Sequence, residues 1–400
     1  MTPNLPTTPP AGAARRARIA IAGVFLVNGA AIGSWVPHIP DVQSALDLST
    51  GVLGLALLAV AAGSLIGLPA AGALVGRFGS RIVVRIAAPA VFAILPLPLL
   101  APSLPAFVVA LVLFGIANGA LDVAMNVQAL TVEDRLGRPI MSSCHGSFSA
   151  GGLIGAGGAG LAIWLGLGPV QHLLWVAVIL LLVTLPALVA LLPTAAAGNR
   201  QPVFAAPRGR LMTLGFLALC ALLAEGSMGD WSAVYLRQTL KTDAGFAALG
   251  YAAFSLAMTL GRLTGDRIVE RHGAVAVLAV GAGGAAGLLG GALLLASPWA
   301  ALLGFAGVGV GIANAIPILF GAAGRLPGIP AGIGLAAVST AGYCGFLAGP
   351  PLIGLVGELL GLSAGLGLVV VGMAIIALGA AGLRRDVRSG EAALGDRAAS

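Results

Sequence analysis

Apolar stretches of about 20 residues recur along the whole chain, and they limit the possible folds more than any other feature. At 1.5 Å per residue, a helix of that length crosses the roughly 30 Å hydrocarbon layer of a membrane. The stretches do not alternate in polarity, so they predict helices and exclude a lipid-facing barrel. We place twelve spans, at about 18–38, 51–75, 82–101, 105–129, 140–165, 170–193, 211–236, 244–268, 274–296, 298–322, 332–356 and 361–383.

Charge gives the expected orientation. Charged residues make up 9% of the chain, far below the quarter or so that a soluble domain carries. Nineteen of the 21 Lys and Arg residues fall on one side of the spans, and only Arg237 and Lys241 fall on the other. Because cytoplasmic loops hold the basic excess, we expect a multi-pass protein of a bacterial inner membrane with both termini in the cytoplasm. The basic residues are dispersed among loops, which makes nucleic acid an unexpected partner.

The sequence contains an internal repeat. "GIAN" at 115–118 returns at 311–314, and the same offset of 196 residues takes Trp35 to Trp231. Landmarks in the same order indicate a duplicated six-helix unit, and an even number of helices makes the repeat parallel. The expected domains are a disordered tail at 1–14, a six-helix bundle at 15–193, a cytoplasmic linker at 194–210, a second bundle at 211–385 and a tail at 386–400. The last dozen residues are also expected to be disordered.

Residues 72–81 (GALVGRFGSR) resemble the loop signature of the major facilitator superfamily, and 270–273 (ERHG) form its counterpart in the second half. The matching residues are Gly72, Arg77, Gly79, Arg81, Glu270, Arg271 and Gly273. The first loop departs from the signature at Gly76, where the family usually has an acid. The resemblance implies an all-α fold of twelve transmembrane helices in two parallel-repeat bundles. Asp122 with His145-Gly146 is similar to a bacterial branch distantly related to fucose permease, in which an acid on the fourth helix accompanies proton coupling.

Polar residues inside the spans are the candidate functional groups. Asn118, Asp122 and Asn126 follow at intervals of four, so they form one stripe about 12 Å long on a helix. A carboxylate inside a membrane is costly, which favours a functional role, whereas the Asn residues could equally join helices. The candidate proton-coupling residues are Asp122, His145 and Glu225. His145 could instead only begin a helix.

The remaining candidates could line a substrate cavity, and they are Asn28, Asn118, Asn126, Asn314, Trp35 and Trp231. The two Trp residues could instead belong to the interfacial aromatic belt. Arg262 and Asp266 are one turn apart, which favours a local ion pair. Gly151, Gly155, Gly345, Gly349 and Gly354 mark the fifth and eleventh spans as the tightest helix crossings.

These features predict a secondary active transporter that works by alternating access, is proton-coupled and moves a small neutral or weakly charged solute such as a sugar. With no basic residue expected deep in the core, a strongly anionic substrate is disfavoured. A proton-driven exporter of lipophilic compounds is the alternative, and a membrane enzyme ranks lower because no Gly-x-Ser-x-Gly or metal-ligand spacing occurs. We expect no enzyme activity, metal or cofactor. The expected partners are substrate, protons and lipid, and the expected functional unit is a monomer.

Overall fold

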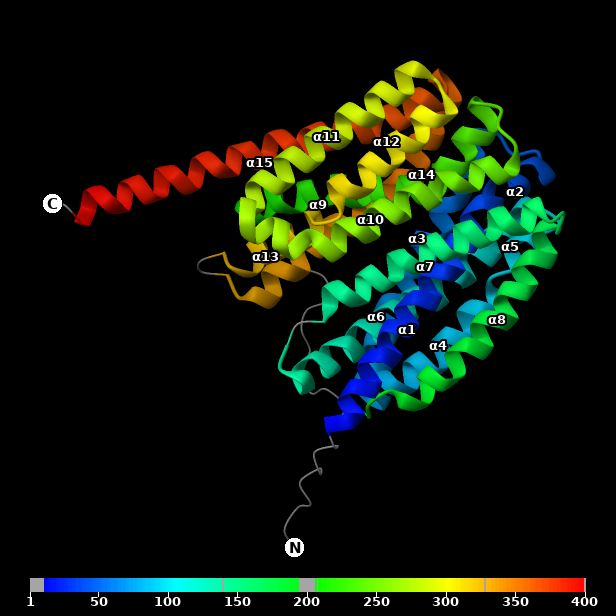
Figure 1. Ribbon diagram of the computed structural model, residues 1–400, viewed down its shortest axis with the longest axis horizontal. Coiled ribbons are helices and arrows are strands. Elements are labelled where there is room, and N and C mark those ends of the chain that lie inside the picture. The colour runs from blue at the N-terminus through cyan, green and yellow to red at the C-terminus, as the bar shows by residue number, and fades with distance from the viewer. Residues whose placement is uncertain (1–10, 139, 194–205, 207, 327–328, 399–400) are drawn as a thin grey trace, which may run out of the picture.

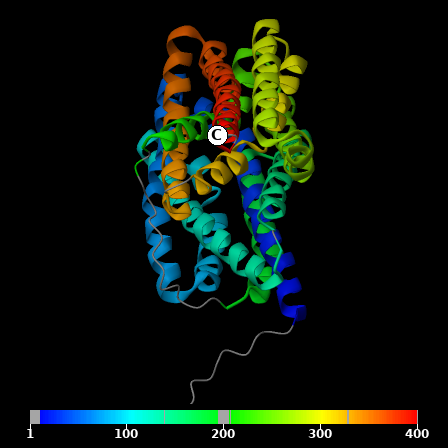
Figure 2. The ribbon, with the colours of Figure 1, turned by 90° about the vertical axis from the view of Figure 1, so that its left-hand side faces the viewer.

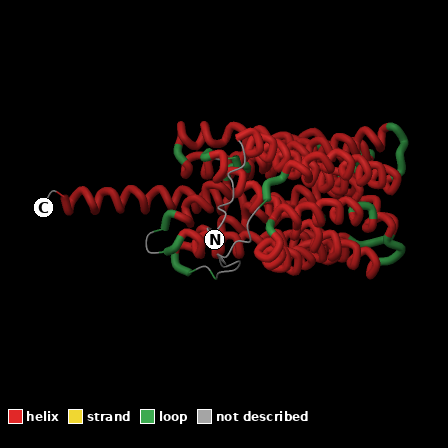
Figure 3. The backbone as a smooth tube through the Cα atoms, turned by 90° about the horizontal axis from the view of Figure 1, so that it is seen from below, coloured by secondary structure: helices red, strands yellow, loops and turns green. Residues whose placement is uncertain are grey.

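The computed structural model describes residues 11–138, 140–193, 206, 208–326 and 329–398. In that part of the chain every regular element is helical and no strand occurs (Figure 3). Twelve segments are long and apolar enough to cross a membrane, which confirms the predicted number of spans. The elements are α1 (Ala11–Trp35), the 3-10 helix η1 (Val36–His38), α2 (Ile39–Ala45), α3 (Thr50–Phe78), α4 (Ser80–Ile94), α5 (Leu97–Leu100), α6 (Leu104–Leu136), α7 (Met141–Trp164), α8 (Pro169–Ala190), α9 (Arg210–Val234), the π-helix η2 (Tyr235–Thr239), α10 (Ala244–His272), α11 (Ala274–Leu295), α12 (Pro298–Ile312), α13 (Ala315–Gly324), α14 (Ala331–Leu360) and α15 (Leu362–Ala398).

The spans form two bundles of six. Helices α1, α3, α4, α6, α7 and α8 pack together in the N-terminal bundle, and α9 to α15 pack together in the C-terminal bundle. Between the bundles, α7 packs along α10 and α3 packs along α14. In Figure 2 the yellow to red helices of the C-terminal bundle lie above the blue to cyan helices of the N-terminal one. This arrangement confirms the predicted fold class.

The repeat is visible in the geometry of α3 and α10, which both have 29 residues. Ser49 and Asp243 cap the two helices by accepting a hydrogen bond from the backbone N–H three residues on, over 3.3 and 2.9 Å. Each helix ends at a glycine with positive φ, Gly79 at φ 81° and ψ 153° and Gly273 at φ 79° and ψ 146°. Only glycine adopts this region readily, so the same turn enters the next helix in both halves.

Both described chain ends lie at one end of the molecule, which we call the terminal end (Figure 1). The opposite end carries η1, α2 and η2, and we call it the closed end because side chains of the two bundles meet there. Gln238 donates a hydrogen bond to Gln43 over 2.7 Å, and the Glu358 carboxylate accepts one from the backbone N–H of Gly51 over 3.0 Å. The bundles diverge from the closed end toward the terminal end in Figure 1.

Glycine lets helices within each bundle cross in backbone contact. A Cβ atom on Gly29 of α1 would overlap the Phe148 carbonyl oxygen of α7, and one on Gly345 of α14 would overlap the Leu219 carbonyl oxygen of α9. These contacts confirm close crossings for the fifth and eleventh spans. A third crossing, of α3 with α6, is equally close because Gly63 lies against the Val112 carbonyl. In lipid such small residues permit the packing that holds helices together.

Two boundaries differ from the predictions, and a third lies largely outside the described residues. Helix α1 begins at Ala11, so the predicted disordered tail at 1–14 is too long at its inner end; residues 11–14 (AGAA) are rich in the best helix former. Helix α15 continues to Ala398, so the last dozen residues are helical as far as they are described (Figure 3). Most of the predicted linker at 194–210 lies outside the described residues. The other domain limits stay predictions.

The tenth span is broken where one continuous helix was expected. Helix α12 ends at Ile312, and α13 begins at Ala315 after Asn314. Pro317 explains the break, because it has no N–H to donate to the carbonyl four residues earlier and its ring crowds that carbonyl.

Candidate functional site

Asp122 is held by side chains from both bundles. On α6, the Asn126 Nδ2 atom donates to the Asp122 Oδ1 atom over 3.2 Å and to its backbone oxygen over 2.8 Å. The two residues therefore share a helix face, as the spacing of four predicted. From α14 in the other bundle, the Tyr343 hydroxyl donates to Asp122 Oδ2 over 3.4 Å. Within the described residues no ion pair reaches Asp122, so neutral groups alone hold this carboxyl.

Glu225 on α9 forms an ion pair with Arg262 on α10. The Arg262 Nη2 atom lies 3.1 Å from Glu225 Oε1, and the Arg262 Nη1 atom donates to the Ser149 hydroxyl over 2.8 Å. Ser149 is on α7, so Arg262 ties the C-terminal bundle to the N-terminal one. The predicted local pair of Arg262 with Asp266 is wrong, because Arg262 lies between α7 and α9 while Asp266 is exposed.

Arg262 also corrects the expectation that no basic residue lies deep in the core. It is on a membrane-spanning helix, 13% of its side chain is exposed, and its charge is matched by Glu225. A matched guanidinium leaves no free positive charge to bind a strong anion. The argument against a strongly anionic substrate therefore still applies, because Arg262 has no free charge to offer it.

His145 and Asp122 are not paired. The His145 ring packs edge-on against Phe25 of α1, with 5.3 Å between ring centroids and an angle of 69°. No hydrogen bond or ion pair between His145 and Asp122 occurs in the described part of the chain. Tyr343 takes the place beside Asp122 that the sequence suggested for the histidine. A proton-coupling role for His145 stays a prediction.

The three other Asn candidates have different surroundings. Asn28 on α1 is fully buried, and both its Oδ1 atom and that of Asn118 have no hydrogen-bond partner among the described residues. Leaving such an acceptor unpaired costs about 1–3 kcal/mol, which a bound polar ligand would recover. Asn314 instead donates to the Gly261 carbonyl over 3.3 Å, where it joins the break between α12 and α13 to α10. Their assignment to a substrate cavity stays a prediction.

Trp35 and Trp231 do not belong to the interfacial belt. Both lie inside the protein, with Trp231 0% exposed and Trp35 packed on Phe107 at 6.4 Å between ring centroids. The exposed tryptophans are Trp164, Trp175 and Trp299, so these fit the belt. The Trp231 Nε1 atom has no partner among the described residues, which keeps it a candidate for ligand contact.

The loop motif of the first half has a packing role in the structure. Arg81 donates to the Val189 carbonyl over 3.3 Å, and Arg85 donates to the Leu188 carbonyl over 2.9 Å. Both carbonyls lie at the C-terminal end of α8, where cations are stabilised by unpaired carbonyls and the helix dipole. Arg77 lies over the Phe78 ring at 5.2 Å. In the second loop, Glu270 and Arg271 are exposed.

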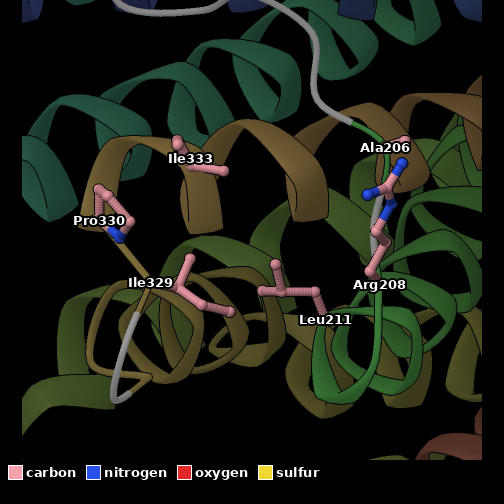
Figure 4. A pocket seen from close by; sticks show the side chains of 6 residues that line it. All are labelled: Ala206, Arg208, Leu211, Ile329, Pro330 and Ile333. Carbon is pink, nitrogen blue, oxygen red and sulfur yellow. The ribbon is translucent and has the colours of Figure 1, made fainter.

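Sequence reasoning missed Tyr343, Ser149 and the full role of Arg262. The signal for Tyr343 was its position within an apolar span, because a buried tyrosine hydroxyl normally has a hydrogen-bond partner. The structure also has a hollow of about 340 Å³ at the terminal end (Figure 4). It is lined by Ala206, Arg208, Leu211, Ile329, Pro330 and Ile333, and none of these was a predicted site residue.

The chain has twelve membrane-spanning helices in two repeated bundles, and acidic side chains form hydrogen bonds between the bundles. These features place it among the polytopic membrane proteins built from two six-helix repeats. A family model described as Major Facilitator Superfamily matches residues 21–329. A protein of Yersinia pestis named as an uncharacterized MFS-type transporter is 41% identical over 327 residues, which cover 82% of this chain and 85% of that protein. The membrane protein MosC of Rhizobium meliloti is 34% identical over 339 residues, which cover 83% of this chain and 81% of MosC.

The fold has solved counterparts. The crystal structure of the nucleoside transporter NupG superposes with a TM-score of 0.67 over 92% of this chain and 98% of NupG, at 15% sequence identity. At that identity the likeness concerns the fold alone. Together with the family match, it shows that the chain belongs to the major facilitator superfamily and is a membrane transporter.

Proposed function

We propose that this protein is a proton-coupled secondary active transporter that works by alternating access. Its substrate is a small neutral or weakly charged organic solute such as a sugar, and it acts as a monomer. It lies in the inner membrane with the terminal end in the cytoplasm, because nineteen of its 21 basic residues fall on that side in the sequence.

The observation that carries the proposal is the hydrogen bond from Tyr343 to Asp122, which joins the two bundles at an acid without a basic partner. Alternating access moves one bundle against the other around a central site. A charged carboxylate resists losing its partners inside a membrane, whereas a carboxyl that has taken up a proton carries no charge to desolvate. Binding of a proton at Asp122 would therefore let the bundles part.

The substrate class follows from the groups between the bundles. Asn126, Tyr343 and Ser149 offer neutral donors and acceptors, and the Arg262 guanidinium is already matched by Glu225. Hydroxyl groups of a polar solute satisfy such donors and acceptors in both directions. No charged substrate is needed to balance this set.

Transport by reconstituted protein tests the coupling. Purified protein in proteoliposomes should accumulate substrate when a pH gradient is applied, and Asp122→Asn should abolish accumulation while sparing binding. Asp134→Asn, on the exposed last turns of the same helix, is the matched control and should transport normally. If Asp122→Asn accumulated substrate as the wild type does, Asp122 would not be the coupling residue.

A thermal-shift screen identifies the substrate class beforehand. Sugars and other polyols, nucleosides, amino acids, organic acids and lipophilic drugs are added to purified protein, because a ligand that binds only the folded state raises its melting temperature. A higher melting temperature in the presence of polyols or other neutral polar solutes supports the proposal. A shift confined to lipophilic drugs would favour an exporter instead.

A further inference from the structure

A short buried segment seals the closed end. Helix η1 follows α1 directly, and all three of its residues, Val36, Pro37 and His38, are buried. The segment contacts α7 from its own bundle and α9 and α10 from the other one. We call η1 together with α2 the plug, because both contact helices of the C-terminal bundle at the closed end, where Figure 1 places α2.

Inside the plug, His38 is the middle of a polar chain. Its Nδ1 atom lies 2.9 Å from the Asp41 carboxylate of α2, and its Nε2 atom lies 2.9 Å from Nδ1 of His172 at the start of α8. Both histidines are buried. Asp41 continues the chain to Arg237 of η2 in the other bundle, at 3.8 Å. The chain thus runs from the N-terminal bundle, through the plug, to the C-terminal bundle.

The donors and acceptors limit how many protons this chain can hold. His38 Nδ1–H donates to Asp41, so the His38 Nε2 atom can accept from His172 Nδ1–H when both rings are neutral. One added proton is tolerated, because one of the two facing nitrogens still has a free lone pair. When both rings carry an added proton, the His38 Nε2–H and the His172 Nδ1–H face each other at 2.9 Å and two positive charges lie side by side. The hydrogen bond between the two histidines then breaks.

An added proton also weakens the contact between the bundles. An imidazolium at His38 competes with Arg237 for the one carboxylate of Asp41. At 3.8 Å the pair of Arg237 and Asp41 is already long, so it is the weaker of the two contacts. Protonation therefore favours release of Arg237, and with it of the C-terminal bundle.

Protons have a path to the chain. Asp41 lines a hollow of about 220 Å³ between α2, α5 and the start of α8, next to Pro98, Leu99, Pro169 and Val170. Its side chain is 23% exposed, whereas that of His38 is 0% exposed. A proton from the water at the closed end therefore meets Asp41 first and His38 next.

Other ionisable residues lie on the helices that pack on the plug. On α7 they are Cys144 and His145, on α9 Arg210, Cys220, Glu225 and Asp230, and on α10 Tyr251 and Arg262, while the remaining charged residues of α10 occupy its last two turns, at the terminal end. Within the described residues, none of them has a hydrogen bond or ion pair to His38. His38 therefore responds directly to Asp41 and His172, and through Asp41 to Arg237.

We propose that His38, His172 and Asp41 form a proton-binding site, and that protonation of this site from outside releases the plug and opens the closed end. Histidine suits the role because each of its two ring nitrogens can carry a proton and take part in the chain of hydrogen bonds. The site is separate from Asp122 and acts on access to the transporter, whether or not Asp122 couples transport to protons.

Distance measurements between spin labels test the proposal. Ala45→Cys at the end of α2 and Thr239→Cys at the end of η2, both exposed, are labelled in full-length protein whose three native cysteines are replaced by serine. In nanodiscs at pH 8 we expect one short distance. At pH 5.5 a longer-distance population should appear as the plug releases.

Substitutions identify the group that senses the proton. His172→Asn keeps a donor at the position of Nδ1 but cannot be charged, so it should lose the long-distance population at pH 5.5. His38→Gln removes the other ring and should do the same if His172→Asn does not fold. His272→Asn, on the exposed end of α10, is the matched control and should respond to pH as the parent protein does.

The outcomes separate this site from the coupling acid. Asp122→Asn should keep the pH-dependent opening, and such a result supports the proposal even if transport is not proton-driven. The proposal is overturned if the parent protein shows no pH-dependent distance. It is also overturned if folded His172→Asn or His38→Gln opens like the parent, or if Asp122→Asn alone removes the response.

Discussion

Removing either partner of the Arg262 and Glu225 pair should destabilise the protein far more than removing both. The pair lies between α9 and α10, with 13% and 20% of the two side chains exposed. Arg262→Gln leaves the Glu225 carboxylate without its counter-charge and also removes the bond to Ser149. Glu225→Gln leaves the guanidinium with Ser149 and a neutral amide.

The expected magnitude follows from burial. Breaking a buried ion pair from one side costs about 3–5 kcal/mol, because the remaining charge is desolvated without a partner. The partial exposure of both side chains places the Glu225→Gln change at the lower end, about 3 kcal/mol, since water can reach the residual charge. The double variant keeps two neutral amides that can bond to each other. It should cost less than either single change, which requires a coupling energy above about 3 kcal/mol, at the upper end of the range for residues in contact.

Reversible unfolding of purified protein measures these free energies, and Arg267→Gln on the exposed face of the same helix is the matched control. That control should stay within about 0.5 kcal/mol of the wild type. If the two single changes summed to the double variant, the residues would not interact in the folded protein. The contact between Arg262 and Glu225 would then not describe the protein in solution.

Three further changes have defined outcomes. Gly151→Leu should prevent stable folding, because the new side chain would overlap the Leu26 carbonyl. Gly157→Leu on the same helix places its side chain in open space and should fold normally. The yield of folded protein and its melting temperature distinguish the two variants. Gly79→Ala should lower the free energy of unfolding by about 1–3 kcal/mol, because alanine is strained at the positive φ of this residue. Gly76→Ala, inside helix α3, is the control, and an equal loss in both variants would show that the positive φ of Gly79 is not the cause. Tyr343→Phe should leave stability within about 1.5 kcal/mol while it alters the pH dependence of transport; an unchanged pH profile would separate Tyr343 from the coupling.

The sequence predicted the architecture well because that architecture depends on local properties. Apolar length locates a span, and a repeated landmark such as Gly79 with Gly273 marks a repeated turn. The tenth span was placed correctly, but the break inside it was not predicted, because one proline, Pro317, interrupts an otherwise uniform apolar run. Residues 11–14 and 386–398 were assigned to the tails but are helical, because alanine-rich segments form helices even where they are not needed to span a membrane.

The site was less predictable because its contacts join distant parts of the chain. The stripe of Asp122 and Asn126 follows from one helix and was predicted correctly. Tyr343 reaches Asp122 from 221 residues away, and no spacing rule selects it. Arg262 had a nearer candidate in Asp266, and only the packing of α10 between α7 and α9 directs it to Glu225. The face of a helix that meets the other bundle depends on how the helices pack in three dimensions, so residue spacing along the chain does not predict it.

The two bundles meet through polar side chains and also through a close backbone crossing at the closed end, where Gly54 of α3 lies against the Pro350 carbonyl of α14. Within a bundle, glycines such as Gly29 and Gly345 bring backbones together, and parting them would leave shaped apolar surfaces without partners. Between the bundles, side-chain hydrogen bonds and ion pairs recur along the helices, at Asp122 with Tyr343, Arg262 with Ser149, Asp41 with Arg237 and Gln43 with Gln238. A neutral hydrogen bond contributes only about 0.5–1.5 kcal/mol net when water can replace it. Under alternating access each of these contacts meets water when its end of the molecule opens, so the bundles can part repeatedly while each stays intact.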